Sequence, residues 1–160
     1  MDKKTCESCF KEKTVLVCSD CDNPSCKKCS CFIDEDEFEY PELLPERFQD
    51  KVFCPSCYNE HAAPVLADYR DILERAKVVN TYDKEQGSET GLIRRIEKPI
   101  VIKDCDDREE TLLRLAFFAA QKGFDTLVDV NITSKKVGKG TYKKLIWHGS
   151  AVPVDPKIRR

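Results

Sequence analysis

The sequence predicts an α+β fold in two parts, a small cysteine-rich finger followed by a βαββ domain that ends in a long hairpin. Nine of the 10 cysteines lie between positions 6 and 57, and strand-like and helix-like patterns alternate through the rest of the chain. Residues 1–62 carry 8 Lys and Arg against 14 Asp and Glu, whereas 63–160 carry 19 against 15. We therefore expect a finger over 1–62, a connector helix over 63–76 and a βαββ domain over 77–160.

The composition narrows the class of protein. The 160 residues include no apolar run near the ~18 that a membrane helix needs, and the N-terminal residues lack the apolar segment of a signal peptide. We expect a cytoplasmic, reducing location, where cysteines more often bind metal than form disulfides. A segment of about 60 residues buries too little surface to be stable through its apolar core alone. Metal is therefore the first hypothesis for the finger.

Eight of the cysteines form four Cys-x2-Cys pairs, which begin at Cys6, Cys18, Cys26 and Cys54. A structural zinc ion takes four thiolate or imidazole ligands in a closed tetrahedron, so eight ligands make two sites. Only four residues separate the second pair from the third, too few for these two pairs to share a site comfortably. We therefore predict two interleaved Zn²⁺ sites, one held by Cys6, Cys9, Cys26 and Cys29 and the other by Cys18, Cys21, Cys54 and Cys57.

The finger also resembles a known family. The run LVCSDCDNPSCKKC at 16–29, closed by VFCPSC at 52–57, resembles the cross-brace zinc fingers of the FYVE/PHD superfamily, in particular the all-cysteine fingers of ADD-type chromatin domains. This resemblance implies the same interleaved ligand pairing. The basic stretch by which FYVE domains bind phosphoinositides is missing, so we expect no membrane partner. RING-type ubiquitin ligases use a similar cross-brace, which keeps a ligase as an alternative.

Two cysteines and one histidine fall outside the eight-ligand pattern. Cys31 could replace Cys29, but the regular Cys-x2-Cys spacing favours Cys29 as the ligand and Cys31 as a small buried thiol. His61, four residues after Cys57, could be a spare ligand, and we favour a solvated side chain at the end of the finger. Cys105 stands apart from the other cysteines, with no His or Asp constellation readable around it. We predict no catalytic role for it.

The second part alternates strand and helix signals. After the amphipathic helix at 64–76, strands are predicted over 77–82 and 92–103, with a loop over 83–91 between them. Asp106 or Asp107 is expected to cap a helix that ends at Gly123, because each Asp has a Glu three residues later. Alternating apolar residues then predict two long strands, one from Val128 through Ile132 and the other from Tyr142 to Ala151.

The predicted helix over 107–122 is apolar nearly all round, whereas a helix that lies on one sheet needs a single apolar stripe. A second surface should cover it, either the finger and connector helix or another subunit, so a homo-oligomer through this helix is one expectation. The stretch 109–154 resembles small bacterial βαββ domains of the YbjQ or dodecin-like type. That resemblance implies a tendency to form rings and implies no reaction.

Two charged segments bear on the choice of partner. An acidic run with two aromatic residues occupies 34–42, so a basic protein segment is a more favourable partner for the finger than a nucleic acid backbone. The hairpin tip carries five lysines, Lys135, Lys136, Lys139, Lys143 and Lys144. A cationic hairpin is more often a solvated edge protected from aggregation, so nucleic acid binding is the less favoured expectation.

The chain shows no pattern typical of an enzyme. Its two histidines stand far apart in the sequence, and the four cysteine pairs are better used as zinc ligands than as redox dithiols. We expect a zinc-stabilised adaptor in which the finger recognises a protein segment and the βαββ domain positions or assembles it. The alternatives are a metal-handling or metal-sensing protein, a RING-like ligase, and nucleic acid binding through the lysine hairpin.

Overall fold

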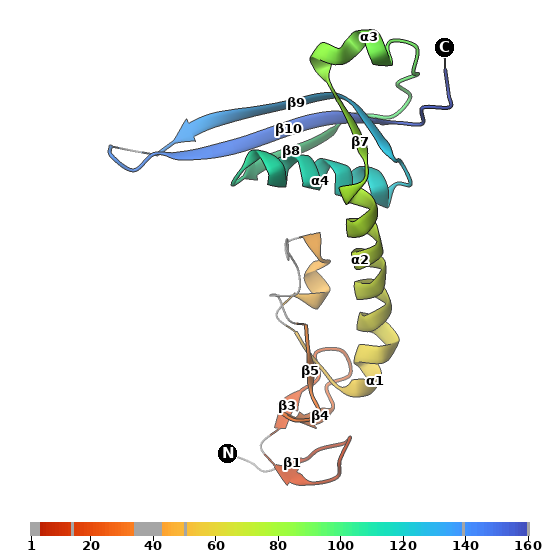
Figure 1. The fold of residues 1–160 in the computed structure, drawn as a ribbon. Helices are drawn as coiled ribbons and strands as arrows, with labels where there is room; N and C mark the ends of the chain where they lie inside the picture. The colour runs from red at the N-terminus through yellow and green to blue at the C-terminus, as the bar shows by residue number, and fades with distance from the viewer. Residues whose placement is uncertain (1–3, 14, 34–42, 50, 139, 160) are drawn as a thin grey trace. The chain divides into compact units, whose positions relative to one another are not determined.

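The computed structural model describes residues 4–13, 15–33, 43–49, 51–138 and 140–159. The chain divides into two compact units, Met1–Tyr69 and Arg70–Arg160, and the boundary falls within the helix α2 (Ala63–Lys77) (Figure 1). This helix covers the segment predicted to be helical over 64–76. The acidic run at 34–42 lies outside the described residues.

The described part of the first unit is built from very short antiparallel strand pairs. They are β1 (Lys4–Thr5) with β2 (Glu12–Lys13), β3 (Val15–Val17) with β4 (Pro24–Cys26), and β5 (Cys31–Phe32) with β6 (Val52–Phe53). A 3-10 turn at Glu46–Phe48 follows β5, and the short helix α1 (Pro55–Cys57) continues through a π-type turn at Tyr58–Ala62 into α2.

The apolar core of the first unit is small. Phe48, Phe53 and Ala62 are buried together, with the two rings 6.1 Å apart. Strand pairs of two or three residues are marginal by themselves. The first unit therefore depends on something besides apolar burial, as the sequence predicts.

The second unit is a four-stranded sheet with one long helix on one face (Figure 1). The strand order is β7-β9-β10-β8, with β10 antiparallel to both of its neighbours and β7 parallel to β9. The elements are β7 (Asn80–Asp83), α3 (Gly87–Thr90), β8 (Ile100–Cys105), α4 (Arg108–Gln121), β9 (Thr126–Val137) and β10 (Lys144–Val154). The predicted α+β class with a long C-terminal hairpin is confirmed, and β7 adds a strand to the βαββ core.

The ends of α4 follow the capping signals in the sequence. The Asp107 carboxylate accepts a hydrogen bond from the Glu110 N–H at 2.7 Å, and the Glu110 carboxylate accepts one from the Asp106 N–H at the same distance. Asp107 is therefore the N-cap, and Glu110 reaches back to the N–H of the residue before the cap, one position earlier than in a standard capping box. Gly123 adopts φ 85°, a left-handed conformation that ends the helix at little cost for glycine.

Two predicted segments differ from the structure. The strand expected over 92–103 begins only at Ile100, because Pro99 has no N–H to donate; within 92–99, Ile93 forms an isolated bridge with Arg159. The loop expected over 83–91 is wrong in part, since it contains a 3-10 turn at Lys84–Gln86 and the helix α3. Asp83 starts this turn through a capping box with Gln86, a signal also present in the sequence.

The helix α4 packs close to the sheet over Gly149. A Cβ atom at this position would lie 2.6 Å from Thr111 Cγ2 and 3.0 Å from Leu115 Cδ1. Thr111 and Leu115 are both fully buried. Position 149 of β10 therefore requires glycine, because α4 lies too close to the strand to leave room for a Cβ atom.

Replacing Gly149 with Ala is expected to lower the free energy of unfolding of the second unit by about 1–3 kcal/mol, because the buried neighbours must move. Urea unfolding followed by the fluorescence of Trp147, the chain's single tryptophan, measures this. Gly87→Ala is the matched control, since a Cβ there meets nothing within 4 Å, and it should change stability by less than about 1 kcal/mol. Equal stability of Gly149→Ala and the wild type would contradict the packing argument.

A half-buried ion pair attaches the segment after α3 to the sheet. The Arg95 guanidinium pairs with both carboxylate oxygens of Asp129 on β9 and donates to the carbonyl oxygens of Thr90 and Ile93 at 3.2 and 3.1 Å. The hydrogen-bonded Arg95 guanidinium holds the pKa of the Asp129 carboxyl below its usual value. Asp129 has φ 53°, a left-handed conformation that Asn also tolerates.

Asp129→Asn should therefore remove the charge without disturbing the backbone, at a cost of about 1–3 kcal/mol at pH 7. Because folding lowers the pKa of Asp129, the stabilisation is present above the unfolded value near 3.8 and is lost as the pH falls through the folded value. The stability difference between wild type and variant, measured by Trp147 fluorescence, should shrink between pH 7 and pH 3. A difference that stays constant over this range would rule out the ion pair as its source.

Candidate metal centre

The first and second cysteine pairs form tight turns that aim two sulfurs in one direction. The Phe10 N–H donates to the Cys6 carbonyl at 2.8 Å, and the Asp22 N–H donates to the Cys18 carbonyl at 3.0 Å. Phe10 and Asp22, each directly after the second cysteine of its pair, adopt left-handed conformations with φ 56° and 59°. The two pairs therefore repeat one local geometry.

The fold gathers the eight sulfurs into two groups, in each of which all sulfurs lie within 4.8 Å of one another. One group is Cys6, Cys9, Cys26 and Cys29, and the other is Cys18, Cys21, Cys54 and Cys57. These are the groups into which the interleaved assignment divides the cysteines. β4 carries Cys26 to the first pair, and the chain at the end of β6 brings Cys54 and Cys57 to the second.

Backbone hydrogen bonds connect the distant pairs within each group. The Cys26 N–H donates to Cys6 Sγ at 3.2 Å, and the Cys54 N–H donates to Cys18 Sγ at 3.3 Å. The two groups therefore share a feature besides their sulfurs: a main-chain donor from the later pair directed at the first sulfur of the earlier pair. Hydrogen bonds of this kind stabilise a thiolate more than a thiol.

The thiol pKa values follow from this arrangement. The N–H of Cys26 lowers the pKa of Cys6 to about 6 against the opposing effect of burial. Burial raises the pKa of Cys18, but N–H donors led by that of Cys54 outweigh it and bring the value to about 6. The neighbouring Cys26 sulfur, followed by burial, raises the pKa of Cys29 to about 12. Burial, together with the neighbouring sulfurs, also raises the pKa of Cys57.

Each group thus contains one sulfur that ionises readily and one that resists ionisation beside it. Four sulfurs at this separation can all be thiolates only when a cation lies among them. Zinc fits the donor set, because Zn–S bonds of 2.3 Å in a tetrahedron place sulfurs about 3.8 Å apart. The distances from Cys9 Sγ to Cys26 Sγ and from Cys21 Sγ to Cys54 Sγ are both 3.8 Å. The structure is consistent with the predicted two zinc ions.

A zinc ion bound in either group would form four metal–sulfur bonds. Because all four ligands come from the protein, no coordination position would be left open for water or a substrate. The sulfur-bearing residues Cys6, Cys18, Cys26 and Cys54 are buried, whereas Cys21 is exposed. A closed four-thiolate site with buried ligands is typical of a structural metal. Its main effect here would be to join the short strand pairs of the first unit.

The other candidate residues lie outside both groups. Cys31 packs against the Phe48 and Phe53 core, and burial raises its thiol pKa, as is usual for an inert cysteine. His61 is half exposed, with its Nε2 atom 3.8 Å from Asp20 and 3.9 Å from Glu60. Cys105 is buried in the second unit, where burial raises its pKa, the opposite of what thiolate chemistry needs.

No family model, no curated protein and no solved structure matches this chain. The two cysteine groups are compatible with a cross-brace zinc finger. Among the described residues, none of the helices is both long and apolar enough to cross a bilayer.

The interleaved pairing can be tested by metal content. Replacing Cys6 and Cys26 together with Ser should leave one zinc per chain, because both ligands belong to one site. A sequential pairing would put Cys6 and Cys26 in different sites, and the same double variant would then lose both metals. Mass spectrometry of the native protein counts the ions. The controls Cys31→Ser and Cys105→Ser should keep two zinc ions each, and loss of a zinc from either would contradict the assignment.

Proposed function

We propose that this protein is a zinc-stabilised adaptor whose finger binds a basic protein segment, and whose second unit positions or assembles the bound partner. The observation that carries the proposal is a groove of about 530 Å³ in the first unit. Its lining comes from the turn of the first cysteine pair, from the end of the second pair and from the fourth pair: Glu7, Ser8, Cys21, Asn23, Cys54, Pro55, Ser56 and Cys57.

The chemistry of this groove suits a basic segment. Glu7 contributes a carboxylate, and Ser8, Asn23 and Ser56 contribute polar groups that can bind a peptide backbone. A zinc ion with four thiolates has a formal charge of −2, and the groove includes three cysteines of the Cys18 group. Both charges favour Lys or Arg side chains of a partner.

Exposed apolar side chains on the same unit would add contact area. Phe10 is 79% exposed at the turn that also holds Ser8, and Phe32 is 48% exposed on β5. Aromatic residues are common anchors at protein interfaces. The combination of a polar groove and exposed aromatic residues supports recognition of a protein segment over storage of metal, since storage would not require either.

Peptide binding to the zinc-loaded full chain tests the proposal. Fluorescence polarisation should show tighter binding of labelled Lys/Arg-rich peptides than of Glu-rich peptides of equal length. Glu7→Lys should weaken the basic peptides by roughly 3- to 10-fold, the range expected for an exposed ion pair replaced by a like-charge contact.

The matched control is Glu97→Lys, the same charge change at an exposed position in the second unit, which should leave peptide affinity unchanged. Zinc content and the Trp147 unfolding curve should be the same for both variants. Failure of any basic peptide to bind, or an equal loss with both variants, would overturn the proposal.

A further inference from the structure

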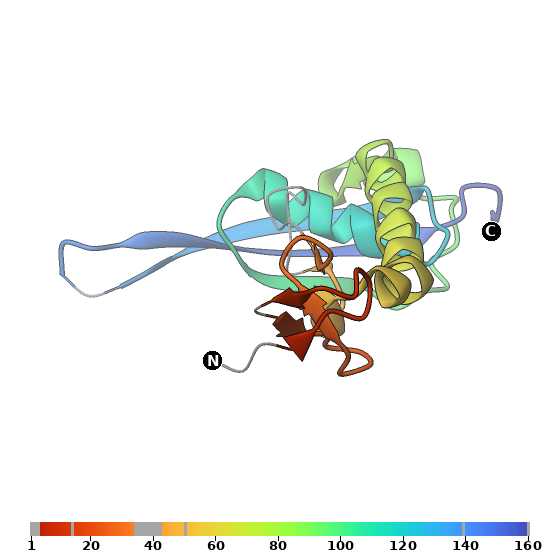
Figure 2. The same ribbon diagram turned by 90° about the horizontal axis from the view of Figure 1, so that it is seen from below.

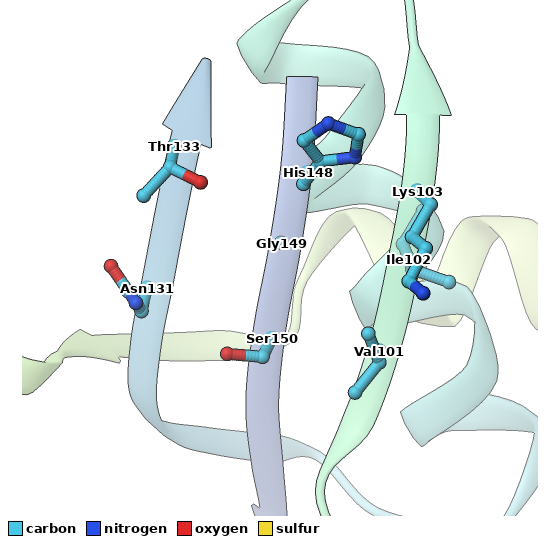
Figure 3. Close-up of a pocket in the computed structure, with 8 residues that line it drawn as sticks. All are labelled: Val101, Ile102, Lys103, Asn131, Thr133, His148, Gly149 and Ser150. Atoms are coloured by element: carbon cyan, nitrogen blue, oxygen red, sulfur yellow. The ribbon is translucent and has the colours of Figure 1, made fainter. Parts of the chain in front are cut away.

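Within the second unit, α4 covers one face of the sheet, and the segment around α3 lies over part of the other. The described helices of this unit therefore leave the middle of β8, β9 and β10 uncovered on that second face, and this area is called the open face. A shallow depression of about 370 Å³ lies on the open face, over β8, β9 and β10 (Figure 3). The side chains that surround it alternate along each strand, Val101 and Lys103 on β8, Asn131 and Thr133 on β9, and His148 and Ser150 on β10. The residues between them, such as Ile102 and Gly149, are buried on the side of α4.

The open face carries several polar side chains, as is common for the solvated side of a sheet. The six side chains offer an ammonium group, an amide, an imidazole and two hydroxyl groups, with Val101 as the one aliphatic contribution. Thr133 is paired with His148, and Asn131 with Ser150, so these donors lie directly opposite one another on β9 and β10. Such a surface can donate many hydrogen bonds but lacks the aromatic anchors of a typical protein interface.

The same strands continue as a cationic arm. β9 and β10 extend past α4 as a two-stranded ribbon (Figures 1 and 2), which carries Lys135 and Lys136 on β9 and Lys144 on β10, with Lys143 just before β10. Lys139 lies outside the described residues. The four described lysines are all exposed, and the alternation of β9 places Lys135 on the same side as Asn131 and Thr133 and Lys136 on the opposite side. Lys135 therefore continues the open face onto the arm, and Lys136 extends the positive charge to the other side of the ribbon.

Two acidic residues lie on or beside these strands. Asp129 on β9 is paired with Arg95, whereas the exposed Asp104 at the end of β8, whose backbone N–H donates to His148 Nδ1 at 3.3 Å, adds one negative charge. Lys144 is paired with Asp106, but both side chains are about two-thirds exposed, 66% and 72%. An exposed pair of this kind is worth little and can exchange for another anion.

We propose that the open face and its lysine arm bind the phosphate backbone of double-stranded DNA. Phosphates are matched by exposed ammonium groups together with hydroxyl and amide donors. Beyond β8 only β9 and β10 remain paired, Lys135–Val137 with Lys144–Ile146, and a two-stranded ribbon can enter the major groove. The six residues of the open face include no Phe, Tyr or Trp, and the arm adds the exposed Tyr142 directly before Lys143. One ring offers little stacking to a run of unpaired bases, which favours duplex over single strands.

This proposal is independent of peptide binding by the finger. It also changes the expectation from the sequence, which favoured a solvated lysine hairpin. The added observation is that the lysines continue a polar, uncovered sheet face that no linear pattern displays. The expected recognition is by backbone charge and shape, with little dependence on base sequence.

Anisotropy with a fluorescent 20-base-pair duplex and the zinc-loaded full chain tests the inference. The logarithm of the association constant should fall linearly with the logarithm of the salt concentration. The double variant Lys135→Glu/Lys136→Glu should lose roughly 10- to 100-fold in affinity at about 0.1 M salt, and the neutral variant Lys135→Gln/Lys136→Gln should lower the salt slope by roughly 2. Trp147 unfolding curves show that the variants are folded.

The matched control is Lys122→Glu, a charge reversal at the exposed end of α4, on the opposite face of the same sheet. It should change duplex affinity by less than about threefold, since a distant exposed charge is largely screened. The inference fails if no salt-dependent binding is seen, or if Lys122→Glu weakens binding as much as the double variant does. It also fails if a 20-base single strand, or a Glu-rich peptide, binds more tightly than the duplex.

Discussion

The first unit is organised around one electrostatic constraint: four sulfurs held within 4.8 Å of one another can all be thiolates only with a cation between them. The strand pairs are two or three residues long and the apolar core is centred on Phe48, Phe53 and Ala62, so little else joins the segments of the finger. The N–H donors of Cys26 and Cys54 prepare the first sulfur of each group as a thiolate. We therefore expect folding of this unit to be coupled to metal binding.

The second unit is stabilised in a different way. Leu115 and Phe117 on α4 and Leu127 and Val128 on β9 are buried, and Gly149 lets the helix approach the sheet closely. Capping at Asp107 and the Arg95–Asp129 pair then attach the polar segments to this core. Because apolar packing already supplies its stability, this unit can leave one sheet face free for polar and cationic side chains.

The two proposed binding surfaces differ in charge. The groove of the finger combines Glu7 with thiolate charge, while the open face and arm combine Lys103, Lys135 and Lys136 with neutral hydrogen-bond donors. Surfaces of opposite charge on one chain suit an adaptor, because each repels the partner of the other. The small net charge of −2 for the whole chain conceals this division.

Local signals in the sequence were enough to predict the α+β class, the helix α2, the limits of α4 and two zinc ions, because cysteine spacing, capping residues and apolar periodicity act over a few residues. Pro99 and the capping box at Asp83 are equally local signals. The predicted strand over 92–103 and loop over 83–91 nevertheless did not take into account that Pro99 delays the strand and that Asp83 starts a turn. The spacing of the cysteine pairs also predicted the interleaved grouping in which the structure places the sulfurs. Only the tertiary structure decided where β7 joins the sheet, and that the lysine hairpin continues an uncovered sheet face. These features depend on contacts between residues far apart in the chain, and no local pattern records them.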